Sequence, residues 1–231
     1  MVIAHRTCPR HAPENSLQGV RTAAQLGADY VELDVRRSRD GVPVVLHDPL
    51  LGRTTDHRGP VRAMSSRRLR GVRLRANGEA LPFLAAVLDE LPDGLGLAID
   101  VKDASSARPV LAVVRRHAPT ARVLLWSQKR RAVRYLADAA PAIEVALLRD
   151  TRSARQEERL LADAVSWGAR AVSVHQDAAR PDLCDRAAQR GLRTYTWFQD
   201  LETQRSRSWY GLAGVVTDWV GEAGDQLTRQ P

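Results

Sequence analysis

Short apolar runs of four to eight residues alternate along the chain with longer amphipathic stretches. Runs of this length, bounded by turn residues, are typical of buried strands. We predict nine strands, at Val2–His5, Tyr30–Arg36, Val42–His47, Leu95–Lys102, Arg122–Ser127, Ile143–Leu148, Ala171–His175, Arg193–Phe198 and Gly214–Asp218. Helical spacing of apolar residues predicts helices at Ser16–Leu26, Leu84–Leu91, Ala107–His117, Lys129–Ala139, Glu157–Trp167 and Pro181–Arg190. Alternating strands and helices indicate a parallel sheet with helices packed outside it.

One connection between predicted strands is too short to hold a helix. The segment 36–42 is shorter than a parallel crossover requires, and it contains Asp40-Gly41, a strong hairpin signal. We therefore predict that Val42–His47 is an antiparallel arm that returns along the second strand. With Asp40 and Gly41 as the two turn residues, Asp34 would face His47.

Without that arm, eight parallel strands remain, which is the number that closes a (β/α)₈ barrel. We predict an α/β fold, a (β/α)₈ TIM barrel with a short antiparallel hairpin arm after the second strand, in a single domain over residues 1–231. The alternative is an open doubly wound sheet. A glycine-rich phosphate loop after the first strand would favour that alternative, and the sequence has none.

Charged residues interrupt the apolar runs near their carboxyl-terminal ends. Glu32 and Asp34 lie two apart, as do Asp100 and Lys102, so each pair shares one face of its strand. In a barrel these strand ends form the rim on which active sites are built. Three converging carboxylates would repel one another, and a divalent cation such as Mg²⁺ or Ca²⁺ would relieve the repulsion. A salt-bridge network with Arg6 and Lys102 is the alternative interpretation.

Two further predicted strands end on histidines, His5 and His47. A single histidine at a strand end is commonly a hydrogen-bonded structural residue. Two of them, each beside acidic strand ends, favour proton transfer.

The formal net charge of +8 adds little to this interpretation. Only Lys102 and Lys129 among the 35 basic residues are lysines, and we interpret the arginine bias as a solvated surface. No basic stripe interleaved with aromatic residues is present, so we expect no nucleic-acid partner. Cys8 and Cys184 lie far apart in the sequence and lack the spacing of a metal site. We therefore interpret them as reduced intracellular thiols. The apolar lead Met1–Ala4 is too short for a signal peptide, and no apolar run approaches a membrane span. We expect a cytoplasmic protein without stable membrane insertion.

Nine short segments form an ordered set that spans about the whole chain. They are His5-Arg6, Pro13-Glu14-Asn15-Ser16, Glu32-Leu33-Asp34-Val35, the run from Asp40 to Asp48, Arg53-Thr54-Thr55-Asp56, Leu81-Pro82-Phe83-Leu84, Ile99-Asp100-Val101-Lys102, Tyr195-Thr196-Trp197 and Val215-Val216-Thr217-Asp218. Each segment alone is a weak signal. The ordered set resembles the glycerophosphodiester phosphodiesterase family, within the superfamily of phosphatidylinositol phospholipase C-like barrels.

The resemblance implies a (β/α)₈ barrel, in agreement with the strand pattern. It also implies an enzyme that hydrolyses glycerophosphodiesters to glycerol 3-phosphate and an alcohol with the help of a divalent metal ion, Mg²⁺ or Ca²⁺. The implied metal ligands are Glu32, Asp34 and Asp100. The implied acid/base pair is His5 and His47.

The resemblance also implies that three more residues bind the substrate, a small-molecule phosphodiester. Arg6 and Lys102 would neutralise the phosphate oxygens. Trp197 would wall the site and contact the alcohol portion.

The sequence departs from the family pattern at two notable positions. Thr7 stands where the family usually has glycine, so the loop after the first strand is expected to follow a different path. Asp100 stands where the family usually has glutamate, and its reach is one methylene shorter.

Two other functions fit the same residues. One is a phospholipase D-like enzyme that acts on lysophospholipids or sphingolipids. The lack of an aromatic or apolar loop suited to a membrane argues against this function. The other is a non-catalytic barrel that binds phosphate esters. The head group, the metal and the oligomeric state are not determined by the sequence.

Overall fold

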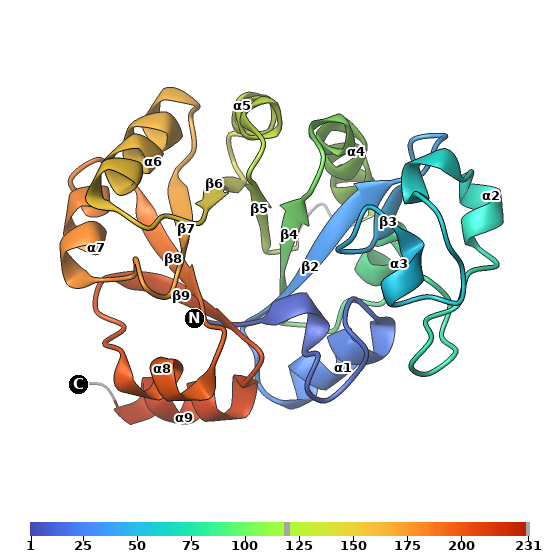
Figure 1. The fold of residues 1–231 in the computed structure, drawn as a ribbon, viewed down its shortest axis with the longest axis horizontal. Coiled ribbons are helices and arrows are strands. Elements are labelled where there is room, and N and C mark those ends of the chain that lie inside the picture. The colour runs from blue at the N-terminus through green and yellow to red at the C-terminus, as the bar shows by residue number, and fades with distance from the viewer. Residues whose placement is uncertain (118–120, 230–231) are drawn as a thin grey trace.

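The computed structural model describes residues 1–117 and 121–229, and its central feature is a closed barrel of parallel strands (Figure 1). The barrel strands are β1 (Val2–Ala4), β2 (Tyr30–Arg37), β4 (Gly96–Val101), β5 (Val123–Ser127), β6 (Glu144–Arg149), β7 (Ala171–His175), β8 (Arg193–Trp197) and β9 (Leu212–Thr217). Neighbours in this order pair in parallel, and β9 pairs with β1 to close the ring. The predicted TIM barrel is confirmed.

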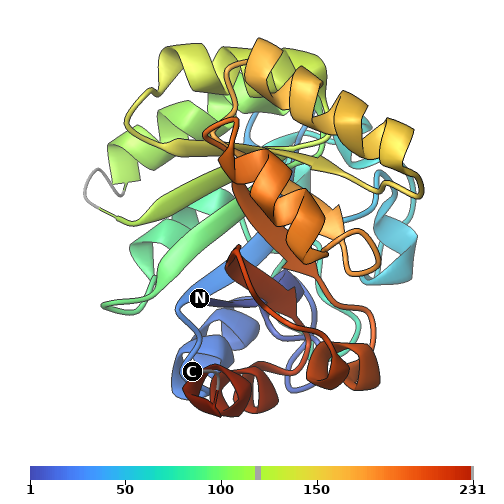
Figure 2. The same ribbon diagram turned by 90° about the vertical axis from the view of Figure 1, so that its left-hand side faces the viewer.

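Helices follow most of the strands and surround the barrel (Figure 2). They are α1 (Leu17–Gln25), α3 (Leu84–Asp89), α4 (Ala107–His117), α5 (Arg130–Ala139), α6 (Ala154–Ser166), α7 (Pro181–Ala188), α8 (Leu201–Ser206) and α9 (Val220–Arg229). All six predicted helices are present, with ends shifted by at most three residues. The prediction did not include α8, α9 or the single turn α2 (Ser66–Leu69). Both α2 and α8 are short and have too few apolar positions to show a helical period. None of the helices in the described ranges is long and apolar enough to cross a bilayer.

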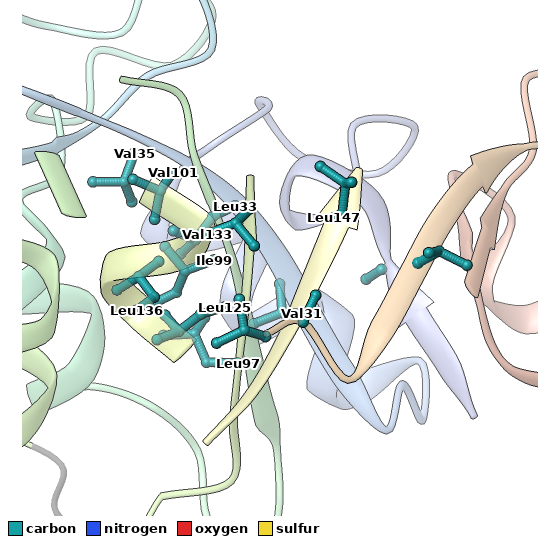
Figure 3. Close-up of a cluster of buried hydrophobic side chains, with 14 of the residues drawn as sticks. Val31, Leu33, Val35, Leu97, Ile99, Val101, Leu125, Val133, Leu136 and Leu147 are labelled. Carbon is teal, nitrogen blue, oxygen red and sulfur yellow. The ribbon is translucent and has the colours of Figure 1, made fainter. Parts of the chain in front are cut away.

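Two apolar cores hold the barrel together. Outward-facing residues of β2 and β4, including Leu33 and Ile99, pack with Val133 and Leu136 of α5 (Figure 3). A second cluster fills the inside of the barrel below the rim that the carboxyl-terminal strand ends form. It consists of Ile3, Tyr30, Ala98, Leu124, Trp126, Ala146, Ala171, Tyr195 and Val216. Because the lower interior is packed with these side chains, polar groups gather at the carboxyl-terminal rim above it.

The hairpin arm β3 (Pro43–Val45) lies antiparallel to β2, outside the ring. The arm is confirmed, but the predicted register is wrong by one residue. Val35 pairs with Val45, and the Leu46 N–H donates to the Asp34 carbonyl, so Leu46 rather than His47 lies opposite Asp34. The cause is a loop of three residues instead of two, with Gly41 as the third at φ +86°, a conformation that glycine adopts easily.

Candidate active site

A cavity of about 320 Å³ opens at the carboxyl-terminal ends of the barrel strands. Side chains of the barrel strands and of the loops that follow them line it. All eight predicted site residues are among the lining residues: His5, Arg6, Glu32, Asp34, His47, Asp100, Lys102 and Trp197. The structure therefore brings together residues that are up to 192 positions apart in the chain.

Three buried carboxylates form the acidic side of the cavity. Glu32 and Asp34 lie on β2. Asp100 lies on the neighbouring strand β4, directly opposite Asp34. One ligand oxygen from each residue lies within 4.8 Å of the others. A set of three oxygen donors at this spacing matches the preference of hard divalent cations.

Two cations share this side of the cavity. Lys102 Nζ lies 2.6 Å from Asp34 Oδ1 and 2.5 Å from Asp100 Oδ2, and Arg6 Nε lies 3.6 Å from Asp34 Oδ2. The salt-bridge network considered as the alternative is thus present. It does not satisfy every acid, because Asp100 Oδ1 is buried without a hydrogen-bond partner. Three carboxylates against two cations also leave one negative charge, so the residues present fit an added divalent cation.

Burial and neighbouring charges act differently on the three acids. Burial, reinforced by the charge of Asp34, raises the pKa of Glu32 to about 7. Burial also raises the pKa of Asp100, despite the opposing effect of Lys102. For Asp34, burial is outweighed by Lys102 and His47, and its pKa falls below the ordinary value. The pKa of Lys102 is raised, since the three carboxylates outweigh the effect of its own burial.

The loop after β1, which carries His5 and Arg6, has an unusual backbone conformation from Arg6 onward. Arg6, Thr7 and Cys8 all have positive φ, and Thr7 at φ 63° occupies a region that favours glycine. Two hydrogen bonds hold Thr7 there: its Oγ1 accepts from the Ser16 N–H at 3.1 Å and donates to the Pro13 carbonyl at 3.5 Å. Gly19 of α1 lies so close that an added Cβ would come within 2.1 Å of the Thr7 carbonyl oxygen. The loop thus takes a left-handed path with threonine in place, stabilised by α1.

Each of the two histidines is bound through Nδ1 to an aspartate. His5 Nδ1 lies 2.7 Å from Asp218 Oδ1, and His47 Nδ1 lies 2.7 Å from Asp48 Oδ1. Burial lowers the pKa of His5, but the hydrogen bond to Asp218 and the charge of Glu32 outweigh it and leave the pKa raised. A hydrogen bond from Arg53 lowers the pKa of Asp48 to about 2. A carboxylate on Nδ1 orients the ring and leaves Nε2 for chemistry.

Sequence reasoning missed two supporting residues. Asp218 follows an apolar strand, which is the same signal that identified the other rim residues, but its partner His5 lies 213 positions away. Asn15 both donates to Asp34 Oδ2 and accepts from the Asp34 N–H, at 2.9 and 3.0 Å. No pattern in the sequence marks Asn15 apart from its place in a family-like segment.

The opposite side of the cavity is mainly apolar. It contains Trp126 of β5, Leu148 of β6, Ser173 of β7 and Trp197 of β8. The buried ring of His175 packs edge-on against Trp197, with ring centroids 5.9 Å apart. This side offers contact surface rather than charge.

The chain matches known proteins over nearly its whole length. The model of the glycerophosphoryl diester phosphodiesterase family matches residues 5–222. A glycerophosphodiester phosphodiesterase of Caldanaerobacter subterraneus is 26% identical over 233 residues, which cover 94% of this chain and 93% of the relative. A Mycobacterium tuberculosis protein named "Probable glycerophosphodiester phosphodiesterase 2" is 40% identical over 128 residues, 54% of this chain. That match spans about half (48%) of the M. tuberculosis relative.

A solved structure shares the fold. A phosphodiesterase of Oleispira antarctica, in complex with its product sn-glycerol-3-phosphate, superposes with a TM-score of 0.88 at 22% identity, covering 99% of this chain and 96% of that one. The family model, the long match to the Caldanaerobacter relative and the shared barrel agree with one another. The chain belongs to the glycerophosphoryl diester phosphodiesterase family.

Proposed function

We propose that this protein hydrolyses glycerophosphodiesters to glycerol 3-phosphate and a free alcohol, with a divalent metal ion and two histidines. The observation that carries the proposal is the matched pair of histidine–aspartate contacts in one cavity, each 2.7 Å long, beside three buried carboxylates. Such an arrangement provides two oriented imidazoles for one phosphodiester.

Glu32, Asp34 and Asp100 would hold the metal ion. When bound, an ion such as Mg²⁺ or Ca²⁺ supplies positive charge that offsets the negative charge developing on the phosphoryl oxygens. Because the pKa of Glu32 is raised to about 7, ion binding near neutral pH would release a proton from this residue.

The chain's own cations act on the same phosphoryl oxygens. A phosphodiester is anionic and repels nucleophiles. Arg6 and Lys102 line the cavity and would reduce that repulsion as charge builds up. Because Lys102 is ion-paired with Asp34 and Asp100, it is already held in position.

The two imidazoles would transfer protons through Nε2. His5 is assigned as the base that takes a proton from the attacking hydroxyl, either water or the substrate's 2-hydroxyl. His47 is assigned as the acid that protonates the departing alkoxide. Asp218 and Asp48 would stabilise the protonated form of each ring.

The test is an assay of glycerol 3-phosphate release from glycerophosphocholine, glycerophosphoethanolamine and glycerophosphoglycerol. We expect activity with added Mg²⁺ or Ca²⁺, loss of activity with a chelator, and recovery when the metal is restored. Lysophosphatidylcholine, assayed in parallel, tests the phospholipase D-like alternative. A protein that cleaves no diester with any metal, yet binds glycerol 3-phosphate, would be a binding barrel and would refute the proposal.

A further inference from the structure

One segment of the chain, next to the β3 arm, is strongly basic. Residues 49–80, here called the basic lobe, contain eight arginines and only two acidic residues. Their net charge is +6, and residues 107–139, with eight basic residues and one acid, form a second basic segment with a net charge of +7. Residues 1–48 contain six arginines and six acidic residues, and so carry no net charge.

The basic lobe has a core of its own, which keeps its arginines on the outside. Leu51, Val61, Leu69, Val72 and Leu74 are buried together with neighbours from the β3 arm. The lobe includes α2 and lies beyond β2 and β3, to one side of the barrel (Figure 1). All eight of its arginines are exposed: Arg53, Arg58, Arg62, Arg67, Arg68, Arg70, Arg73 and Arg75.

Carboxylates do not neutralise this charge. Among the residues that the structure describes, Arg53 is the one arginine of the lobe that forms an ion pair. The two acids of the lobe are engaged elsewhere. Asp56 accepts the Arg73 backbone N–H and pairs with His57, and Glu79 accepts the Leu17 N–H at the start of α1. Seven guanidinium groups thus remain without a carboxylate partner in the described structure.

A high arginine content does not by itself leave guanidinium groups without carboxylate partners. Residues 140–190 also hold eight arginines, but they hold eight acids as well. There, Glu157 is ion-paired with both Arg180 and Arg186, and Arg190 with Glu158. The excess charge therefore belongs to particular segments, and the lobe is the one whose Arg53 contacts Asp48 and Glu14 at the rim of the active site.

The lobe is fixed to the rim of the active site. Asp48 contacts both the His47 ring and Arg53, and Arg53 also forms two hydrogen bonds with Glu14. Leu50, two positions after Asp48, has 55% of its surface exposed. The lobe thus carries an exposed apolar side chain close in sequence to the rim residue Asp48.

We propose that the basic lobe docks on the surface of an anionic phospholipid bilayer. Arginine guanidinium groups bind phosphate in a bidentate manner, and clusters of basic residues bind anionic lipid surfaces. Leu50 enters the headgroup boundary. The lobe contains no Phe, Tyr or Trp, so it lacks the stacking surface that single-stranded nucleic acids use.

The choice of a bilayer also rests on the proposed function. A glycerophosphodiester is a glycerophospholipid that has lost both acyl chains. The class of reaction that supplies it is therefore hydrolysis of acyl esters at a membrane surface. Docking beside the cavity places the enzyme where its substrate is released.

The test is co-sedimentation of the full chain with vesicles of phosphatidylcholine alone or mixed with phosphatidylglycerol. We expect binding to the anionic vesicles at about 0.1 M salt and its loss at about 1 M salt, where charges are screened. The lobe variant Arg62→Glu/Arg67→Glu/Arg68→Glu should lower the affinity at least about tenfold. The matched control Arg155→Glu/Arg159→Glu/Arg170→Glu makes the same charge change at exposed positions elsewhere and should bind nearly as the parent does.

Three outcomes would overturn the docking proposal: equal binding to neutral vesicles, equal loss in both variants, or binding to duplex DNA but not to anionic vesicles. If the glutamate variant unfolds, the milder Arg62→Gln/Arg67→Gln/Arg68→Gln variant replaces it. Both lobe variants should hydrolyse a soluble diester at the parent rate. Vesicle binding by a protein that cleaves no diester would refute the proposed function and leave the docking intact.

Discussion

The mouth of the barrel has two sides that differ in chemistry. On one side, β1, β2 and β4 lead to His5, Glu32, Asp34, Asp100 and Lys102, which are charged or titratable. On the other, β5 to β8 supply Trp126, Leu148, Ser173 and Trp197. An apolar wall lowers the local dielectric, so it strengthens the interactions of the charged groups opposite. The comparison supports the proposal that proton transfer and charge neutralisation belong to one side, and contact with the alcohol to the other.

The largest expected effect comes from the charged side. His47→Ala should lower kcat by about a hundredfold or more, because it removes the proposed proton donor to the departing alkoxide. Steady-state kinetics on glycerophosphocholine measures this effect. The matched control is His117→Ala. His117 ends α4, outside the cavity, and its Nδ1 makes a similar 2.7 Å contact to Asp89. Parent-like turnover in His47→Ala would remove His47 from the mechanism.

A smaller effect of a different kind is expected from the apolar side. Trp197→Ala should raise KM by about three- to tenfold and change kcat less, because it removes contact surface that serves substrate and transition state alike. Initial rates over a range of substrate concentrations separate the two parameters. Trp167→Ala, made outside the cavity, is the control. A loss confined to kcat would contradict the division between the two sides.

The smallest effect concerns stability and tests the buried charge of Glu32. Its pKa in the folded protein is about 7, above the ordinary value of 4.5. As pH rises between these values, the folded state keeps a proton that the unfolded state has lost. This group therefore destabilises the metal-free protein increasingly as pH rises, and fully above pH 7.

Replacing Glu32 should remove that destabilisation. Glu32→Gln is expected to raise the Tm of the metal-free protein by at least about 2 °C at about pH 8, and to leave it nearly unchanged at about pH 4. Thermal unfolding followed by circular dichroism measures this difference. Glu202→Gln, at an exposed position on α8, should show no such pH-dependent gain. A lower Tm for Glu32→Gln at high pH would mean that the carboxylate is stabilised where it lies.

The barrel could be predicted from the sequence because its signals are local. Each strand is a short apolar run, and each polar rim residue, such as His5 or Asp100, stands at the end of its own run. The one-residue error in the hairpin arm has a physical reason. The register depends on the backbone angles of Gly41, which no periodic pattern records.

Contacts across the barrel could not be predicted in this way. The bond between His5 and Asp218 forms only because β9 closes the ring beside β1. Likewise, the pKa of Glu32 depends on burial by several strands at once. The identity of the metal and the cytoplasmic location stay predictions.

The fit between Thr7 and Gly19 has a consequence for anyone who exchanges parts between related barrels. A side chain at position 19 would collide with the backbone of the loop that presents His5, and the Thr7 hydroxyl anchors the segment leading into α1. The residues at positions 7 and 19 therefore depend on each other structurally. A chimera that takes its first loop from one parent and α1 from another should therefore carry both residues from the same parent.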